Sequence, residues 1–576
     1  MASVEKRIQR RSVASTEAFS SVPPVLAAIY AARGIISESQ LDTSLSKLLS
    51  PNDLKDIELA SSILANAIQN QQRMLVVGDF DADGATSCTL SLLCLRAMGA
   101  SWVDFLVPNR FEYGYGLTPQ IVDLAMQYSP DLIITVDNGI ASIDGVERAN
   151  ALGCKVVVTD HHLPGEKLPA AAAIVNPNQP GCAFESKGIA GVGVIFYLML
   201  AVRSNLRELG HFAGRNEPNL AEFLDLVALG TVADVVPLDH NNRILVQQGL
   251  MRIRAGRCRP GISALLRVAN RDQERVSASD IGFAIGPRLN AAGRLDDMSI
   301  GIQCLLENDP NRAYQLAGML NDFNLDRRAI EASMQQEAEI VLQKMEQASS
   351  IGCTICLADS SWHQGVIGIL ASRIKEKYHR PCLIFAPGDE GQLKASGRSI
   401  AGFHLRDALD ELATRYPHLL QKFGGHAMAA GLTIAETSFQ EFCEAFELIA
   451  AEKLDDSALD AIIYSDGELH KSHLDIGFAQ KLRDAGPWGQ AFPEPVFDGE
   501  FIFLQQRIVG GKHLKCLLAP CEDISHCLDG IAFNVDVTQW PAPEESRVHV
   551  VYSLDVNYFR GVESVQLMIH HMELLA

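Results

Sequence analysis

Short apolar runs alternate with helical patterns through the first part of the chain. The apolar runs lie at residues 73–78, 102–107, 132–136, 155–159 and 172–175, and their lengths are typical of buried strands. Helical periodicity occupies residues 85–98, 118–128 and 141–152 between them. This alternation predicts a doubly wound, mostly parallel sheet. Ligands of such sheets bind beyond the carboxyl ends of the strands.

The pattern changes twice further along the chain. Residues 190–345 are rich in helix formers and predict a helical connector. A second α/β pattern follows, with strands at 354–358 and 381–385, helices at 366–377 and 438–453, and Gly-rich turns between them. Beyond residue 460, strand-like runs at 501–504, 514–518, 547–552 and 565–570 predict a small β-barrel or sandwich.

Length and charge narrow the possible functions. A chain of 576 residues is long enough for three or four domains. The formal net charge of -21 excludes a generally basic surface that would hold nucleic acid without specificity. No apolar run reaches the length of a membrane span, and the thirteen scattered cysteines favour reduced thiols in the cytoplasm.

Three carboxylates follow the first predicted strand. Asp79, Asp81 and Asp83 lie within five residues, before Gly84 and the next helix. Carboxylates this close repel one another unless a cation neutralises them, so the spacing indicates a divalent metal site. An acidic loop that caps the following helix is the alternative interpretation.

Further acidic and imidazole groups follow the other strands. Asp137 comes after the third predicted strand, and Asp160, His161 and His162 come after the fourth. Asp234 follows a later helix. The carboxyl ends of parallel strands share one edge of the sheet, so these groups should converge on one crevice. Carboxylates and imidazoles without thiolates suit Mg²⁺ or Mn²⁺, and their number is enough for two ions.

At this point the motifs resemble a known family. DFDADG, VDNG, DHH and VADVVPL, in this order, are similar to the motifs of the DHH phosphoesterase superfamily. SSWHQGVIGILASRI, ASGRSI and FGGHAMAAG resemble its associated DHHA1 domain. PRLNAAGR and PWGQAFPEPVF extend the resemblance over about residues 45–570, to the RecJ family of bacterial exonucleases. That family removes nucleotides from the 5' end of single-stranded DNA.

The resemblance implies an α/β protein of four domains after an N-terminal extension. These are a doubly wound parallel-sheet DHH domain, a helical connector, a smaller α/β DHHA1 domain and a C-terminal OB-like β-barrel that binds nucleic acid. The expected boundaries are 1–45 for the extension, then 46–240, 241–348, 349–455 and 456–576.

The resemblance also implies roles for the acidic and imidazole groups. The positions that match metal ligands are Asp81, Asp83, Asp137, His161 and Asp234. Asp137 is expected to bridge two ions, and His162 to assist at the phosphate or the leaving group. Asp79 either replaces a histidine ligand that some relatives carry or supports the site.

Positive charge is needed near the metals to hold a polyanionic substrate. The candidates from the sequence are Arg110 with Tyr113 and Tyr115, Arg288, Arg294, Arg373 and Arg398. Isolated arginines are more often solvated surface residues, and those in Gly-rich turns are better candidates because backbone amides also reach phosphate there. By resemblance, the DHHA1 side of the cleft consists of Ser396, Arg398, Gly424, Gly425 and His426.

The sequence therefore predicts a two-metal hydrolase in which metal-bound water attacks phosphorus without a covalent nucleophile. By resemblance it is a 5'–3' exonuclease on single-stranded DNA that acts in DNA repair and recombination. Its expected partners are single-strand DNA-binding protein and a recombination helicase, and we expect a monomer with no membrane contact. One alternative is a phosphodiesterase for short oligoribonucleotides or cyclic dinucleotides, and another is a replication scaffold that has lost its ligands. The length of the chain disfavours the first, and the complete set of ligands disfavours the second.

Overall fold

The computed structural model describes residues 6–109, 113–347, 351–559 and 561–575. The chain forms two compact units. One comprises Met1–Gln9 and Asp322–Tyr464, and the other comprises Arg10–Asn321 and Ser465–Ala576. The boundary falls within the long helix α14 (Pro310–Gln347), so we describe the two units separately.

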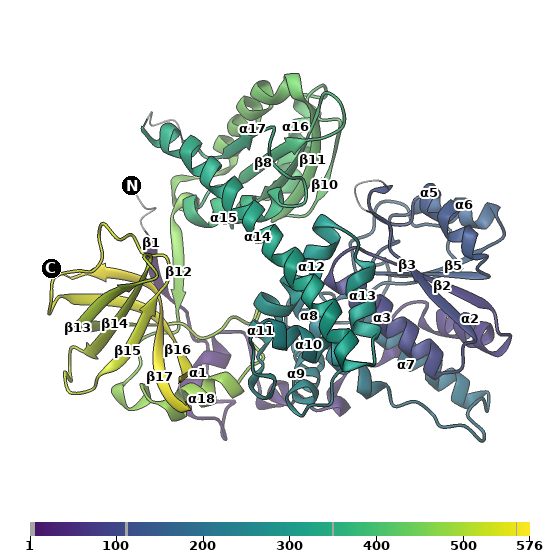
Figure 1. Ribbon diagram of the computed structural model, residues 1–576, viewed down its shortest axis with the longest axis horizontal. Helices are drawn as coiled ribbons and strands as arrows, with labels where there is room; N and C mark the ends of the chain where they lie inside the picture. The colour runs from purple at the N-terminus through teal and green to yellow at the C-terminus, as the bar shows by residue number, and fades with distance from the viewer. Residues whose placement is uncertain (1–5, 110–112, 348–350, 560, 576) are drawn as a thin grey trace. The chain divides into compact units, whose positions relative to one another are not determined.

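A five-stranded parallel sheet is the framework of the larger unit (Figure 1). Its strands are β2 (Arg73–Gly78), β3 (Trp102–Leu106), β4 (Leu132–Val136), β5 (Lys155–Thr159) and β6 (Ala173–Val175). They lie in the order β3-β2-β4-β5-β6, which confirms the predicted doubly wound sheet. The chain builds outward from β2 to β3 and then returns to add β4 on the other side. The switch in direction between β2 and β4 is where a ligand site is expected.

Helices cover this sheet, since its strands are buried on both faces. Leu75, Val77, Ile133 and Val156 point into a core that α5 (Pro119–Ala125) and α6 (Ile143–Ala151) close. Other helices in the described part of this domain are α2 (Ile57–Gln69), α3 (Ala82–Ala97) and α7 (Gly191–Glu208). No helix of the described residues is both long and apolar enough to cross a membrane.

The predicted helical connector is present in the same unit. It contains α8 (Leu224–Ala233), α9 (His240–Arg254), α10 (Pro260–Val268), α11 (Ala278–Asp280), the π-helical turn η7 (Ile281–Ile285), α12 (Gly286–Leu295) and α13 (Ser299–Leu306). The segment GPRLNAAGR is helix α12, which agrees with the predicted helical connector, and Arg288 and Arg294 lie on it.

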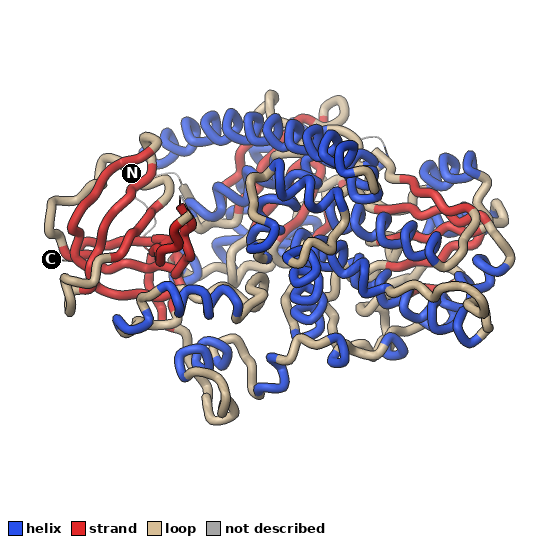
Figure 2. The backbone as a smooth tube through the Cα atoms, turned by 60° about the horizontal axis from the view of Figure 1, so that its bottom comes forward, coloured by secondary structure: helices blue, strands red, loops and turns tan. Residues whose placement is uncertain are grey.

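The C-terminal strands close into a barrel, seen in red at one end of Figure 2. They are β13 (Phe497–Val509), β14 (His513–Pro520), β15 (Leu528–Ala532), β16 (Arg547–Phe559) and β17 (Val562–Leu574), in the order β13-β14-β15-β17-β16. The barrel is therefore the correct choice between the two predicted architectures. Phe501 and Phe503 are buried in it, whereas Phe533 is exposed.

An N-terminal segment packs against the residues that lead into the barrel. Arg33, just after α1 (Pro24–Ala31), donates to both carboxylate oxygens of Asp466 at 2.7 and 2.9 Å. Tyr30 stacks on Phe492 and Trp488, at centroid distances of 6.3 and 6.1 Å. Helix α18 (Ile476–Asp484) precedes these aromatic residues. The N-terminal segment therefore shares an aromatic contact with the residues that directly precede the barrel.

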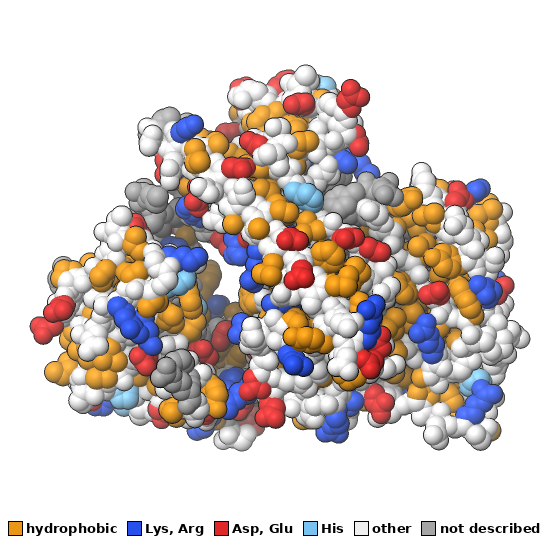
Figure 3. Space-filling model, viewed as in Figure 1, with side chains coloured by type: hydrophobic (Ala, Val, Ile, Leu, Met, Phe, Trp, Pro, Cys, Tyr) orange, Lys and Arg blue, Asp and Glu red, His pale blue; other side chains and the backbone are white. Residues whose placement is uncertain are grey.

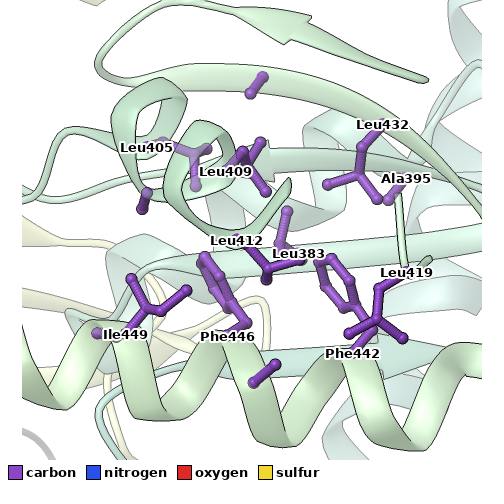
Figure 4. Close-up of a cluster of buried hydrophobic side chains, with 14 of the residues drawn as sticks. Leu383, Ala395, Leu405, Leu409, Leu412, Leu419, Leu432, Phe442, Phe446 and Ile449 are labelled. Carbon is purple, nitrogen blue, oxygen red and sulfur yellow. The ribbon is translucent and has the colours of Figure 1, made fainter. Parts of the chain in front are cut away.

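The smaller unit contains a second five-stranded sheet. Its order is β10-β11-β9-β8-β7, with strands β7 (Ile355–Ala358), β8 (Cys382–Pro387), β9 (Gln392–Arg398), β10 (Lys422–Gly425) and β11 (Ala429–Ala435). Figure 4 shows the core between this sheet and helices α16 (Leu405–Arg415) and α17 (Phe439–Lys453). Helices α14 and α15 (Ile367–Tyr378) enclose a separate core with Leu370 and Ile374. Strands β1 (Lys6–Arg10) and β12 (Ala461–Ser465) pair separately.

The predicted Gly-rich turns of this unit were largely wrong. Three strands and helix α16 occupy residues 392–435, and in β9 and β11 every second residue is buried, small Ala and Gly among them. Ser396 and Arg398 consequently lie on a strand, and Gly424 and Gly425 end the next strand of the chain.

Candidate active site

Carboxylates and imidazoles converge at the switch point of the larger sheet. Asp79 follows β2, Asp137 follows β4, and the two histidines follow β5. Three groups of side chains have ligand atoms within 4.8 Å of one another: Asp79, Asp81 and Asp137; Asp83, His161 and Asp234; Asp137, His161 and His162. Asp137 and His161 each belong to two groups. The arrangement therefore offers room for two cations with shared ligands.

Asp137 occupies an unusual backbone position. Its φ of 61° lies in the left-handed region, which costs free energy for most residues but is tolerated by Asp and Asn. The next residue, Asn138, holds the turn by donating to the carbonyls of Val77 and Val136 at 3.1 and 2.9 Å. A Cβ on Gly191 would come within 2.7 Å of Asp137 Oδ1, so only glycine leaves room for this carboxylate.

The first turn of α3 carries two of the other carboxylates. This helix begins at Ala82, three residues earlier than expected, with Asp81 as its N-cap accepting from Gly84 N at 3.0 Å. Buried Asp83 accepts from the first amides of α7, Gly191 N at 2.6 Å and Val192 N at 2.9 Å. Helix capping and metal ligation, which we considered as alternatives, thus involve the same loop.

The DHH segment is organised by its aspartate. Asp160 Oδ1 accepts from the backbone amides of His161 and His162, and lies 2.7 Å from His162 Nδ1. His161 Nε2 lies 3.2 Å from Asp137 Oδ1 and 3.5 Å from Asp234 Oδ2. Although burial opposes it, hydrogen bonding to Asp160 raises the pKa of His162 to about 9. His162 is therefore a cation at neutral pH, while His161 faces the carboxylates.

The buried carboxylates lie so close together that their negative charges repel one another. Burial, followed by the charge of Asp81, raises the pKa of Asp83 to about 7. Burial and the neighbouring carboxylates also raise the pKa values of Asp137 and Asp234 well above their usual range. Divalent cations would remove this repulsion, and the oxygen and imidazole donors suit Mg²⁺ or Mn²⁺.

Several positioning residues were not predicted from the sequence. Asn178 donates to His161 O at 2.7 Å and to Lys187 O at 3.1 Å. Asn176 donates to His162 O at 2.9 Å. Together they fix the backbone of both histidines. The segment NPN directly after β6 is the only signal in the sequence that pointed to them.

Helix α12 supports the site differently from what we expected. Asn290 Oδ1 accepts from Ala82 N at 2.7 Å, and a Cβ on Gly293 would meet Phe80 O at 1.7 Å. The helix therefore lies directly against the acidic loop. Arg288 is buried and donates to Ala284 O at 2.6 Å and to Asn321 Oδ1 at 3.1 Å. These contacts hold Arg288 within its own helical region, and its substrate role stays a prediction.

Of the aromatic and basic candidates nearby, Tyr115 is at the site. Its hydroxyl lies 3.2 Å from His162 Nδ1 and 3.2 Å from the carbonyl oxygen of Asp137. Tyr113 packs at the edge of the domain core. Arg110 lies outside the described residues. Tyr115 is thus placed to contact a substrate beside His162.

The smaller unit brings its predicted residues together at one corner of its sheet. Arg398 Nη1 donates to Gly397 O at 2.8 Å and to Ser396 Oγ at 3.2 Å. Arg398 pairs in register with Ala429, whose carbonyl accepts from His426 N at 2.7 Å after the left-handed turn at Gly425. Arg373 is set apart from them, because its Nε bonds to Glu331 Oε1 at 3.1 Å.

We predict that Asn178→Ala weakens metal use more than it weakens the fold. Without its amide, the carbonyl of His161 loses its anchor, and the histidine ligand is less well oriented. Loss of such a supporting bond typically costs about 10- to 100-fold in metal affinity. The Mn²⁺ concentration for half-maximal activity should rise by this factor.

Asn150→Ala is the matched control for this prediction. Asn150 makes a similar bond, to Ala170 O at 2.9 Å, but is exposed on α6. Both variants should lower the melting temperature slightly, and only Asn178→Ala should change the metal requirement. Equal metal requirements in the two variants would remove Asn178 from the site.

The fold and the site together define a class of protein. A parallel sheet with acidic and DHH motifs at its carboxyl edge, followed by a second α/β domain, characterises DHH phosphoesterases. Residues 73–231 match the model of the DHH family N-terminal domain, and residues 349–452 match the DHHA1 domain. Residues 465–571 match the RecJ OB domain.

Comparison with individual proteins identifies the family. The chain is 56% identical over 572 residues to the single-stranded-DNA-specific exonuclease RecJ of Dickeya dadantii, covering 99% of each chain. It is 54% identical to the Escherichia coli (strain K12) protein of the same name, covering 98% of this chain and 99% of that one. The structure of RecJ in complex with Mn²⁺ from Thermus thermophilus superimposes with a TM-score of 0.81 at 29% identity, covering 98% of this chain and 79% of that one. The chain therefore belongs to the RecJ family.

Proposed function

We propose that this protein is a metal-dependent exonuclease that hydrolyses single-stranded DNA from its 5' end to 5' mononucleotides, in DNA repair and recombination. The observation that carries the proposal is the sharing of Asp137 and His161 between adjacent ligand groups. This is the arrangement that two-metal hydrolysis of a phosphodiester requires. RecJ relatives from several bacteria, named as single-stranded-DNA-specific exonucleases, support the choice of substrate.

The residues of the chain define the rest of the mechanism. Two divalent ions, when bound by the acidic groups with His161, supply an activated water and offset charge on the phosphate. Asp160 holds His162 through Nδ1 and keeps it protonated, so Nε2 can donate a proton to the leaving oxygen or a hydrogen bond to the phosphate. Tyr115 lies beside the same imidazole and limits its movement.

Groups outside the metal centre hold the strand. By resemblance, the terminal phosphate binds Ser396, Arg398, the Gly424–Gly425 turn and His426, with Arg110, Arg288 and Arg373 as further candidates. The barrel holds single-stranded DNA further from the cut. Basic and acidic side chains are interspersed on the visible face in Figure 3, so any contact with phosphates must be local. A surface of mixed charge favours binding of phosphates at particular sites over non-specific electrostatic binding of nucleic acid.

The proposal also covers the oligomeric state, location and partner proteins of the enzyme. We infer that it acts as a monomer in the cytoplasm, with single-strand DNA-binding protein and a recombination helicase as partners. Sedimentation with and without each purified partner tests both statements. A protein that sediments as a monomer alone, and as a larger complex only when a partner is added, would agree with both statements. A stable dimer of the protein alone would contradict the monomeric state.

Digestion of end-labelled strands tests the activity itself. We expect release of a 5' label as mononucleotide from single-stranded DNA with Mg²⁺ or Mn²⁺, and much slower release from duplex DNA or from RNA. Preference for oligoribonucleotides of a few residues, or for cyclic dinucleotides, would favour the alternative phosphodiesterase. No hydrolysis of any of these would contradict both.

Arg398→Ala should weaken capture of the strand more than metal loading. Arg398 is half-buried and its guanidinium lies beside Gly368, where it can form charge-assisted bonds with a phosphate. Losing such bonds typically costs about 10- to 100-fold in affinity. KM for single-stranded DNA should rise accordingly, while calorimetry should show normal Mn²⁺ uptake.

Two further variants sharpen this test. Arg398→Lys keeps the charge but loses the planar fork, so its KM should fall between those of wild type and the alanine variant. Arg415→Ala removes an exposed arginine of the same unit that pairs with Glu452, and should leave KM unchanged. An unchanged KM in Arg398→Ala would exclude this residue from substrate binding.

A further inference from the structure

Phe283 is the most exposed large aromatic residue in the described part of the chain. It is 77% exposed, although the residues around it on the same turn, Ile281, Ala284 and Ile285, are buried. It lies in the π-helical turn η7, where Gly286 N donates to Ile281 O, five residues back. π-turns are costly and are often retained at functional sites. The wide turn holds the ring outward on a rigid base.

The turn is packed against the end of helix α8, which carries a metal ligand. A Cβ on Gly282 would lie 3.5 Å from Val232, and one on Gly286 would lie 3.2 Å from Ala233. Asp234 is the next residue of the chain and caps α8. α11, η7 and α12 follow one another without a break, and α8 packs against η7 and α12. Phe283 is thus fixed relative to the metal centre by the backbone of its own unit.

One accessible stripe connects Phe283 with the acidic loop. Phe283, Pro287, Asn290 and Arg294 are three or four residues apart, so they share one helical face, and the residues between them are buried. Asn290 on this stripe binds Ala82 N of the acidic loop. Seven residues of helix separate Asn290 from Phe283, a distance of about 10 Å. Phe283 therefore lies on the accessible face that leads away from the acidic loop.

We propose that Phe283 is a stacking platform for an unpaired base of the substrate strand close to the cleaved end. This inference rests on the proposed function. An aromatic ring stacks on any base, so it provides grip without sequence preference. A base within a duplex has both faces covered by its neighbours and cannot reach the ring without being extruded. Phe283 therefore contributes to the preference for single strands as well as to affinity.

Binding and abasic substitution together test the proposal. Affinity is measured at physiological salt with Ca²⁺ in place of Mn²⁺, using a 12-nucleotide strand and versions that lack one base at each position from the 5' end. Phe283→Ala should raise Kd by about 5- to 100-fold. Phe283→Trp should retain wild-type affinity. Under hydrolysis with Mn²⁺, the change should appear in KM rather than kcat.

The position of the stacked base gives a second readout. Removing that base should weaken binding by wild type but not by Phe283→Ala, because the variant has already lost the contact. Tyr128→Ala is the matched control, since Tyr128 is a partly exposed aromatic residue near the start of β4, at the opposite edge of the sheet. Its abasic profile should equal that of wild type.

The possible outcomes separate this proposal from the proposed function. Unchanged affinity in Phe283→Ala would overturn the stacking role even if the strand is degraded normally. The role would also be overturned if removing a base weakened binding by the same factor in the variant as in wild type at every position of the strand. Selective binding without hydrolysis of the full strand would contradict the exonuclease and leave the stacking role supported. A wild-type protein that binds no single-stranded DNA would overturn both.

Discussion

Replacing Asp137 with asparagine will reduce hydrolysis of single-stranded DNA by about a thousandfold or more. Asp137 belongs to two ligand groups, so its loss disturbs both expected ion positions at once. Asparagine is the informative substitution because it has nearly the same shape and tolerates the left-handed backbone at this position. The change therefore removes charge with little effect on the fold. Initial rates at saturating Mn²⁺ measure it.

Asp131→Asn is the control for this experiment. Asp131 lies just before β4, at the end opposite Asp137, and accepts from Arg73 N at 2.7 Å. This variant should keep most of the wild-type rate. A rate in Asp137→Asn above about one hundredth of wild type, with Mn²⁺ occupancy unchanged, would show that Asp137 does not bridge the ions.

The sequence predicted the parallel sheet and the metal centre for a common reason. Short, fully apolar runs mark strands that are buried on both faces, and the first polar residues after each run mark the carboxyl edge. Asp79 and Asp137 follow such runs directly, and His161 follows after one further residue, Asp160. Their convergence therefore needs only the rule that parallel strands end on the same side.

Contacts between distant segments could not be predicted in this way. Asn290 and Ala82 are 208 residues apart, and nothing in either segment specifies the other. The same holds for Asn178, whose partner carbonyl belongs to the DHH turn. Gly-rich strands such as β10 were also missed, because glycine usually signals a turn and here allows close approach of neighbouring strands. Tertiary packing decided each of these cases.

Metal-free protein will lose stability as the pH rises from about 4 to about 7. The pKa of Asp83 is raised to about 7 in the folded state, whereas an unfolded aspartate has its ordinary value near 4. Between these values the folded chain holds a proton that the unfolded chain has released, so raising the pH favours unfolding. The raised pKa values of Asp137 and Asp234 extend the effect to higher pH.

Metal should reverse this trend, since ions bind only the deprotonated carboxylates. Addition of Mn²⁺ should therefore raise the melting temperature strongly at pH 8 and little at pH 5. At a hundredfold excess over Kd, one site contributes about 2.7 kcal/mol. Thermal melts with EDTA or Mn²⁺ across this pH range measure both trends.

Other groups of the protein also titrate, so the decisive quantity is the difference between wild type and a variant. In EDTA, Asp234→Asn removes one of the repelling charges and should be more stable than wild type above about pH 7, with the difference vanishing near pH 4. In Mn²⁺ at pH 8 the order should invert, because the variant lacks a ligand. If Asp234→Asn is less stable than wild type in both EDTA and Mn²⁺, the Asp234 carboxylate stabilises the fold even without metal. In that case, repulsion between the carboxylates does not destabilise the metal-free protein.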